Sequence, residues 1–223
     1  NIAGKPTDQN GTGFISRLNP DGSIADRKWA TGLDAPKGIG ILDGKLYVTD
    51  VDEFVQIDIE DPTQQERFPV EGAIFLNDVT VGRRAIYFSD MKTGKLHQFA
   101  QGKVSTVDTG LKGINGLAYF AEEDLLYLLT AQGLQRRLDD GTYETVNPQV
   151  TNGDGLVILG DDEFIASRWQ GEIWYVNGAE ATKMLDSKDQ EIQTADLGYD
   201  AQRSMLYVPR FFANKVTAFQ FSR

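Results

Sequence analysis

The chain has 223 residues, of which 40% are hydrophobic, so it is long and apolar enough for one domain with a proper core. Its formal net charge of −11 argues against DNA, RNA or an acidic membrane surface as a partner, because the long-range field repels polyanions. Cysteine is absent, which excludes disulfides, thiolate metal sites and a cysteine nucleophile.

No apolar run approaches the roughly 18 residues of a membrane span. We therefore expect a soluble protein without a membrane span. The sequence leaves open whether it is cytoplasmic, periplasmic or secreted, and what its oligomeric state is.

Residues 1–13 are polar and lack periodicity, which predicts a loop. Two short stretches of strand-type composition, 14–18 and 24–29, flank the turn Asn19-Pro20-Asp21-Gly22 and predict a hairpin. Repeats of short strands and tight turns then follow to the end of the chain. We expect them to begin near residues 36, 77, 115, 154 and 195, the first four with four strands each and the last with three.

Tyrosines in the second strand of a repeat make the period measurable. They stand at Tyr47, Tyr87, Tyr127 and Tyr207, in steps of 40, 40 and 80 residues. Residues 164–167 form the expected second strand of the repeat between Tyr127 and Tyr207, which has no tyrosine at this position. A period of about 40 residues, rich in short strands, is typical of a β-propeller with one four-stranded sheet in each repeat.

The count of repeats predicts an all-β, six-bladed propeller that forms a single domain over residues 1–223. The opening hairpin takes the place of a first blade that lacks its inner two strands. By the same period, we expect the natural protein to have about 25 residues before Asn1.

Each repeat opens on a residue that starts its first strand, which we call a pivot. The pivots are Lys37, Asn77, Asn115, Asp154 and Ala195. First strands line the channel of a propeller, so pivots are expected to meet at one end of it. Three of them offer side-chain oxygen, which suits a hard divalent cation such as Ca²⁺. The alternative is that Asn115-Gly116 and Asp154-Gly155 are simply tight-turn dipeptides.

Three segments resemble the metal-binding motifs of the senescence-marker-protein (regucalcin)/gluconolactonase family of six-bladed propellers. They are Phe75-Leu76-Asn77-Asp78, Asn115-Gly116-Leu117 and Asp154-Gly155-Leu156. The resemblance implies a divalent cation, Ca²⁺ or else Zn²⁺, Mn²⁺ or Mg²⁺, bound by Asn77, Asn115 and Asp154. It further implies that Asp154 is the catalytic base of lactone hydrolysis, and that a fourth ligand, a Glu, belongs to the half-blade before Asn1.

Sugar-lactone members of that family carry an arginine at the position of Phe75. The phenylalanine therefore argues against an aldonolactone as the substrate. Arg168 and Arg210, at the ends of two second strands, are candidates for binding an anionic or carbonyl-rich ligand. The alternative for both is a salt bridge to Asp50 or Asp90. Lys37 is a third candidate for substrate binding, and the alternative for it is a side chain that extends to solvent.

The sequence therefore predicts a metal-dependent hydrolase of lactones or related esters, in which the ion polarises the carbonyl and Asp154 accepts a proton from water. Asp78 and Asp196 are the next candidates for the base. His97 is the only histidine, and we expect it on an outer strand, away from the channel, as a surface or packing residue. A serine triad at the channel would therefore lack its histidine base. The competing prediction is a non-catalytic propeller that binds a partner and holds only a structural metal or water cluster.

Overall fold

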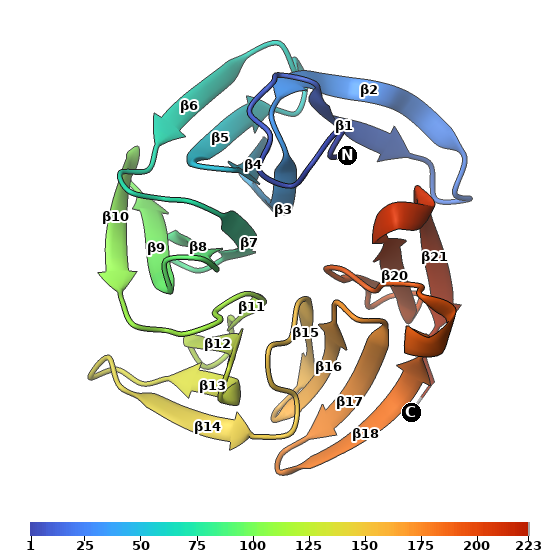
Figure 1. Ribbon diagram of the computed structural model, residues 1–223. Coiled ribbons are helices and arrows are strands. Elements are labelled where there is room, and N and C mark those ends of the chain that lie inside the picture. Colours follow the sequence, from blue (N-terminus) through green and yellow to red (C-terminus); the bar gives the residue numbers. More distant parts are fainter. Residues whose placement is uncertain (223) are drawn as a thin grey trace. The chain divides into compact units, whose positions relative to one another are not determined.

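A computed structural model describes residues 1–222 and shows a chain built from β-strands and two single-turn 3₁₀ helices. By the density of its internal contacts the chain divides into two compact units, Asn1–Gly110 and Leu111–Arg223. Each unit is a series of antiparallel sheets whose strands follow one another in chain order (Figure 1).

The first unit has one two-stranded and two four-stranded sheets. The hairpin pairs β1 (Gly13–Leu18) with β2 (Ile24–Leu33). The next sheet contains β3 (Pro36–Leu42), β4 (Lys45–Asp50), β5 (Glu53–Asp58) and β6 (Gln65–Pro69). The third contains β7 (Leu76–Val81), β8 (Ile86–Asp90), β9 (Lys95–Ala100) and β10 (Lys103–Asp108).

The second unit has two four-stranded sheets and one three-stranded sheet. The first sheet contains β11 (Leu117–Phe120), β12 (Leu125–Thr130), β13 (Gly133–Arg137) and β14 (Tyr143–Asn147). The second contains β15 (Leu156–Gly160), β16 (Glu163–Arg168), β17 (Glu172–Asn177) and β18 (Glu180–Asp186). The third contains β19 (Gly198–Asp200), β20 (Met205–Arg210) and β21 (Lys215–Gln220), with the helices η1 (Lys188–Gln190) and η2 (Phe211–Ala213) before and within it.

Sheets of this kind are propeller blades, and the described residues form five of them rather than the predicted six. The sixth predicted blade corresponds to the hairpin β1–β2, which has two strands only. Residues 1–12 contain no strand, so nothing in the described chain supplies an inner pair for this hairpin. The count of six was wrong because it included this hairpin, predicted as a first blade without its inner two strands, and a two-stranded hairpin is not a blade.

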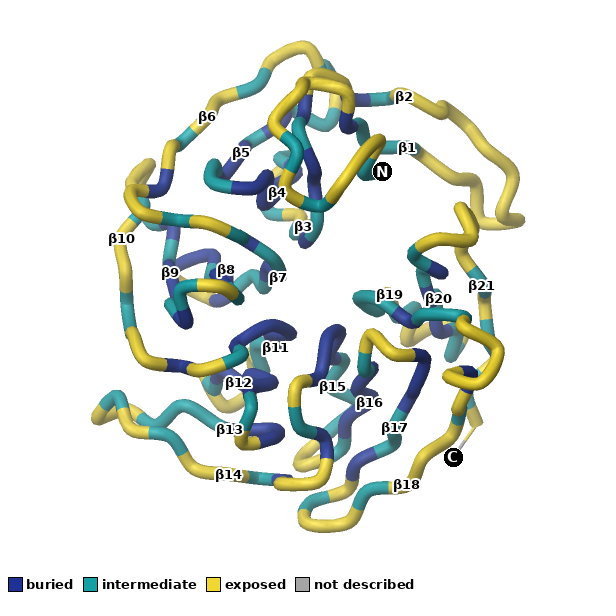
Figure 2. Tube along the Cα trace, in the orientation of Figure 1, coloured by how far each residue is buried: buried dark blue, intermediate teal, exposed yellow. Residues whose placement is uncertain are grey.

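Burial falls from the second strand of each blade to the outer strand (Figure 2). Every residue of β4 and β12 after the first is buried, whereas the outer strands β10 and β18 are mostly exposed or half-buried. Apolar side chains pack between neighbouring sheets. In the first unit Phe54 stacks on Phe88 of the next sheet with ring centroids 4.3 Å apart, and in the second unit Tyr127 packs on Phe164 at 4.8 Å.

His97 lies on β9, the third strand of its sheet, and only 1% of its surface is exposed. Its ring stacks on Phe88 at 5.2 Å between centroids, and its Nδ1 lies 3.2 Å from Thr106 Oγ1. Burial lowers the pKa of the imidazole, so the neutral form is favoured. The prediction of a packing role is confirmed.

Candidate functional site

A serine at the end of β16 joins two first strands of the second unit. The Oγ of Ser167 accepts a hydrogen bond from the Gly155 N–H at 2.8 Å and donates one to the Ala195 carbonyl at 2.6 Å. The Asp154 N–H donates to the Ser167 carbonyl, also at 2.8 Å. The segment that carries Asp154 is therefore fixed beside the segment that carries Asp196.

Glycines directly after two pivots allow this close approach. A Cβ on Gly116 would lie 2.2 Å from the Asp154 carbonyl oxygen, and one on Gly155 would lie 2.5 Å from the Leu197 nitrogen. Neither glycine has a positive φ, so neither forms the primed hairpin turn that Asn-Gly and Asp-Gly favour. The tight-turn alternative for these two dipeptides is therefore wrong, and their glycines serve the packing of adjacent blades.

Asn115 and Asp154 form a direct contact at the start of their blades. The Asn115 Nδ2 donates a hydrogen bond to the Asp154 Oδ1 at 2.9 Å. Both residues are buried, with 8% and 9% of their surfaces exposed. The other amide atom, Asn115 Oδ1, is buried without a hydrogen-bond partner. A buried acceptor of this kind costs free energy unless a cation or a water molecule satisfies it.

Asp154 has a strongly raised pKa. Burial is the largest cause and the negative charge of Asp196 adds to it, while the hydrogen bond from Asn115 acts in the opposite direction; together they raise the pKa to about 7. A carboxyl group in this state accepts a proton readily near neutral pH. The same surroundings favour a bound cation, which would relieve the repulsion between the two carboxylates.

The residues around Asp154 fit a hard divalent cation. The Asn115 Oδ1 is unsatisfied, its amide contacts the Asp154 carboxylate, and Asp196 is near enough to Asp154 for its negative charge to raise the Asp154 pKa. Side-chain oxygens of this kind are the ligands that Ca²⁺ prefers. Asp196 was predicted from the sequence only as an alternative base, because its pivot position is held by Ala195.

Asn77 is the second residue of β7 in the first unit, and its Nδ2 lies 4.0 Å from the sulfur of Met91. That Asn77 shares an ion with Asn115 and Asp154 stays a prediction. The first unit has the same pair of hydrogen bonds as those that Ser167 forms near Asp154. Thr49 Oγ1 accepts a hydrogen bond from the Gly38 N–H at 3.0 Å and donates one to the Asn77 carbonyl.

Lys37 does not extend freely into solvent. Its Nζ donates a hydrogen bond to the Ala35 carbonyl at 2.9 Å and lies 4.5 Å from the centroid of the Phe75 ring. Burial lowers the pKa of the ammonium to about 8, against the opposing charge of Asp50. The Phe75 ring thus forms one side of the surroundings of the Lys37 ammonium group.

The carboxylates of Asp50 and Asp90 accept hydrogen bonds from backbone N–H groups. The Asp50 carboxylate accepts the N–H groups of Asp34 and Ala35 at 2.7 and 2.6 Å. Asp90 accepts the N–H groups of Ile74 and Phe75 in the equivalent place of the next sheet. Each carboxylate thus caps the loop that enters its own blade, and the salt bridge given as the alternative for Arg168 and Arg210 is not among the ion pairs of residues 1–222.

The structure brings Asp50 together with two other acidic residues, a cluster that the sequence did not reveal. Oxygen atoms of Asp34, Asp50 and Glu53 lie within 4.8 Å of one another, and burial raises the pKa of Asp50. Asp34 lies in the loop between β2 and β3, whereas Asp50 ends β4 and Glu53 begins β5, so spacing alone gave no sign of the group. The Asp50 oxygens are already engaged by backbone, and we assign this group no ligand.

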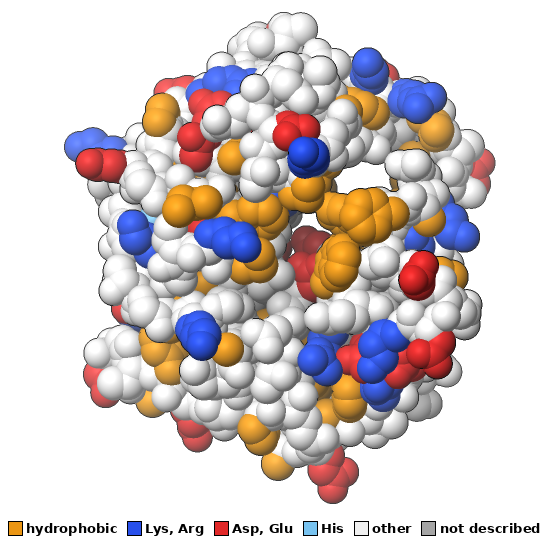
Figure 3. All heavy atoms as spheres, in the orientation of Figure 1, with side chains coloured by type: hydrophobic (Ala, Val, Ile, Leu, Met, Phe, Trp, Pro, Cys, Tyr) orange, Lys and Arg blue, Asp and Glu red, His pale blue; other side chains and the backbone are white. Residues whose placement is uncertain are grey.

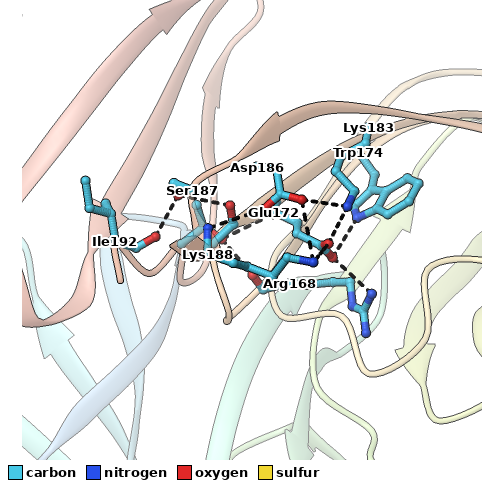
Figure 4. A network of polar contacts seen from close by, with 10 residues as sticks. Arg168, Glu172, Trp174, Lys183, Asp186, Ser187, Lys188 and Ile192 are labelled. Carbon is cyan, nitrogen blue, oxygen red and sulfur yellow. Dashed lines mark hydrogen bonds and ion pairs between the residues drawn. The ribbon is translucent and has the colours of Figure 1, made fainter. Parts of the chain in front are cut away.

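Arg168 pairs instead with Glu172, across the hairpin of β16 and β17, at 2.9 Å between Nη1 and Oε2. Glu172 is 1% exposed and also binds Lys183 and Lys188, each at 2.6 Å, and the Trp174 Nε1–H at 3.2 Å (Figure 4). Burial raises the pKa of Glu172, but these hydrogen bonds and the charge of Arg168 outweigh it and bring it down to about 2. Figure 3 shows basic and acidic side chains gathered at the lower right of the visible face.

Arg210 is a buried cation without an acidic partner. Only 7% of it is exposed, its Nε donates to Thr217 Oγ1 at 3.3 Å, and its guanidinium lies 5.5 Å from the Phe219 ring centroid. Its Nη1 is buried and has no hydrogen-bond partner, and burial lowers its pKa. No carboxylate in residues 1–222 forms an ion pair with it, so its positive charge is not compensated.

No helix within residues 1–222 has the length and hydropathy needed to cross a membrane. Searches against protein-family models and against curated proteins found no match. Comparison with solved structures, in contrast, found many similar chains.

A chain of a nidogen/laminin complex is similar with a TM-score of 0.78 and 14% identity, over 94% of this chain and 87% of that one. A catalytically inactive virginiamycin B lyase from Staphylococcus aureus, crystallised with quinupristin, has a TM-score of 0.69 and 13% identity over 93% and 73%. The PQQ-bound aldose sugar dehydrogenase of Streptomyces coelicolor has a TM-score of 0.68 and 14% identity over 88% and 80%. These neighbours are propellers, and the chain has the β-propeller fold predicted from its repeats.

At such identities the similarity concerns the fold alone. The predicted membership of the regucalcin/gluconolactonase family is not confirmed by these neighbours, which are propellers of other kinds.

Proposed function

We propose that the protein is a metal-dependent hydrolase of lactones or related esters, related to the regucalcin/gluconolactonase family, with its reacting group at Asn115, Asp154 and Asp196. The observation that carries the proposal is the unsatisfied Asn115 Oδ1 beside a buried carboxyl group whose pKa is raised to about 7. Two of the structural neighbours are enzymes, a lyase and a sugar dehydrogenase, which supports the fold as a catalytic scaffold.

Asn115, Asp154 and Asp196 are the residues that would hold the cation in the second unit, and Asn77 is the further ligand expected from the sequence. A divalent cation in this place supplies Lewis-acid polarisation of a carbonyl oxygen. Ca²⁺ is the ion we expect, because the donors are all oxygen.

Asp154 has the proton-accepting role. Its carboxylate is held by Asn115 Nδ2 on one oxygen, which fixes its orientation, and its backbone is held by Ser167. A water molecule that attacks a carbonyl carbon loses a proton as the new C–O bond forms, and the Asp154 carboxylate is the acceptor that we propose. The pKa of about 7 belongs to the site without a cation; a bound divalent cation would lower it and make Asp154 a weaker base, whose main role would then be to orient the attacking water. Asp196 strengthens the basicity of Asp154 through its negative charge.

Hydrolysis of a panel of small lactones and aryl esters tests the proposal. We expect turnover that a chelator abolishes and that Ca²⁺, Mn²⁺ or Zn²⁺ restores. The Asp154→Asn variant should lose at least about 100-fold in kcat, since positioned proton transfer contributes that much or more. Asp43→Asn is the control, because Asp43 is an exposed turn residue whose left-handed conformation Asn also adopts.

Full activity in Asp154→Asn would contradict the assignment and direct attention to Asp196 or Asp78. A second candidate function is a non-catalytic propeller that binds a protein partner, favoured by the similarity to a chain from a nidogen/laminin complex. Metal-dependent stability without turnover on any member of the panel would support this second function.

A further inference from the structure

The hairpin of β1 and β2 has a free edge. Within residues 1–222, β1 is hydrogen-bonded to one strand, β2, whereas the third strands β5 and β9 of the other two sheets of the first unit have a strand on both sides. Asn1 lies along the free side of β1 as a strand would. Its amino group donates to the Phe14 carbonyl at 2.8 Å, and its carbonyl accepts the Phe14 N–H at 3.1 Å, which is the reciprocal pair of antiparallel strands. Its Nδ2 also donates to Ser16 Oγ at 2.8 Å, so Asn1 is placed as the last residue of a strand beside β1 (Figure 1).

Two apolar side chains of β3 are uncovered. Ile39 is 51% exposed and Ile41 is 64% exposed. They stand directly opposite Val48 and Leu46 of β4, so these four side chains share one face of their sheet. Val48 and Leu46 are buried in a cluster against which Ile15 of β1 packs. The hairpin therefore covers the second strand on this face and leaves the first strand open.

The next sheet of the first unit shows what covers these positions elsewhere. On β7 the same two places, in the same register with the second strand, belong to Val79 and Val81. Val79 is only 7% exposed, because β3 lies over it: a Cβ on Gly40 would be 3.1 Å from Val79 Cγ1 and 3.0 Å from Val81 Cγ2. The first strand of one sheet thus covers the first strand of the next. Ile39 and Ile41 lack a strand of this kind.

We propose that the free edge of β1, together with Ile39 and Ile41, binds an antiparallel pair of strands that extends the β1–β2 hairpin to a four-stranded sheet. The occupant is the segment that the repeat period places before Asn1, about 25 residues of the natural protein. A strand that ends at Asn1 pairs with β1, and its partner strand then covers the two isoleucines. Such a pair of strands needs no ion and no reaction at Asp154, so it is independent of the proposed hydrolase.

Thiol labelling tests the proposal, because the chain has no cysteine of its own. Ile41→Cys and Ile39→Cys are introduced separately into the 223-residue chain and into the natural protein with its upstream residues, and the rate of reaction with a maleimide is measured. We expect labelling to be at least about tenfold slower in the longer protein, where the covering strand must first open. Ile24→Cys is the matched control, because Ile24 is 61% exposed on the outer strand β2 and should react equally fast in both chains.

Amide hydrogen exchange along β1 should also slow in the longer protein and stay the same along the outer strand β10. Unchanged exchange along β1 would contradict pairing at its edge. A natural protein whose intact mass shows that it begins at Asn1, or equal labelling of Ile41→Cys in both chains, would overturn the proposal. Labelling of Ile41→Cys that slows as the 223-residue chain is concentrated would show that a second copy covers this surface, and would overturn it as well.

Discussion

At the scale of single residues, Asp154 combines two properties that oppose each other. The Asp154 carboxyl group is buried near the Asp196 carboxyl group, so its ionisation costs free energy. For the same reason, the Asp154 carboxylate readily binds a cation or a proton. Natural sites of this kind keep such groups at a cost in stability that function explains.

The Asp154→Asn variant should therefore be more stable than the parent protein at neutral pH when metal is absent. The pKa rises from 3.8 in the unfolded chain to about 7 in the folded one, so the folded state holds the extra proton between these values. The free energy of unfolding then falls as the pH rises from about 4 to 7. We expect a gain of about 1–3 kcal/mol for the variant at pH 8 and little difference at pH 4.

Urea unfolding at several pH values in a chelating buffer measures this difference. Asp43→Asn again serves as the control, since it should follow the parent protein at every pH. Stability curves of Asp154→Asn and the parent that stay parallel from pH 4 to 8 would show that Asp154 titrates normally.

At the scale of strands and hairpins, Glu172 organises the end of the fourth blade. Its carboxylate holds Arg168 at the end of β16, Lys183 on β18 and Lys188 in η1, so one buried anion on β17 is connected to three other elements. Ser187, whose Oγ donates to the Ile192 carbonyl at 2.7 Å, closes the same loop.

Glu172→Gln should destabilise the protein by about 2–4 kcal/mol, because it leaves clustered cations without their buried partner. Chemical denaturation at pH 7 measures the loss. The folded pKa of about 2 lies below the ordinary value of 4.5, so this contribution is present above pH 4.5 and disappears as the pH falls toward 2. Glu144→Gln, which breaks an exposed pair with Arg136, is the control and should cost no more than about 1 kcal/mol. A smaller effect of Glu172→Gln than of this control would contradict the assigned role.

The repeat pattern predicted the strands well because it arises from contacts within one blade. The small polar residue that ends a second strand was visible in the sequence, and Thr49 and Ser167 now show its purpose, a hydrogen bond to the next pivot segment. The partner of Arg168 was not predictable in this way. It depends on the pairing of Arg168 with Glu172 across a hairpin, which the spacing of apolar residues does not reveal.

The site was predictable in part for the same reason. Asn115 and Asp154 were found because their blades share a period, and their hydrogen bond agrees with that prediction. The sequence predicted Asp196, which lies one residue beyond its pivot, only as an alternative base and not as a cation ligand. It gave no sign of the uncompensated charge on Arg210. Both features follow from burial, and burial of a polar group cannot be read from its position in a repeat.

At the scale of the whole molecule, the net charge of −11 favours cations over anions in the surrounding solution. Binding to the folded state alone stabilises a protein by an amount that grows with ligand concentration, about 2.7 kcal/mol at 100 times Kd. Any divalent ion held by the Asp154 site should therefore act on global stability.

Addition of Ca²⁺ to the chelator-treated protein should raise its Tm in a saturable way, measured by differential scanning calorimetry. Asp154→Asn should remove most of that rise, whereas Asp43→Asn should retain it. A rise of equal size in both variants would show that Ca²⁺ acts on the acidic surface in general rather than on this site.

The hydrogen bonds between second-strand hydroxyls and pivot carbonyls have a consequence for local unfolding of the protein. Second-strand hydroxyls and pivot carbonyls bind each other across sheets, whereas the outer strands β10 and β18 have exposed surfaces and a neighbour on one side only. Local opening should begin at these rims and reach the pivots last. Amide hydrogen exchange would then rank residues by the depth of their strand within a blade, with slow exchange at Gly155 and Ala195 and fast exchange along β18.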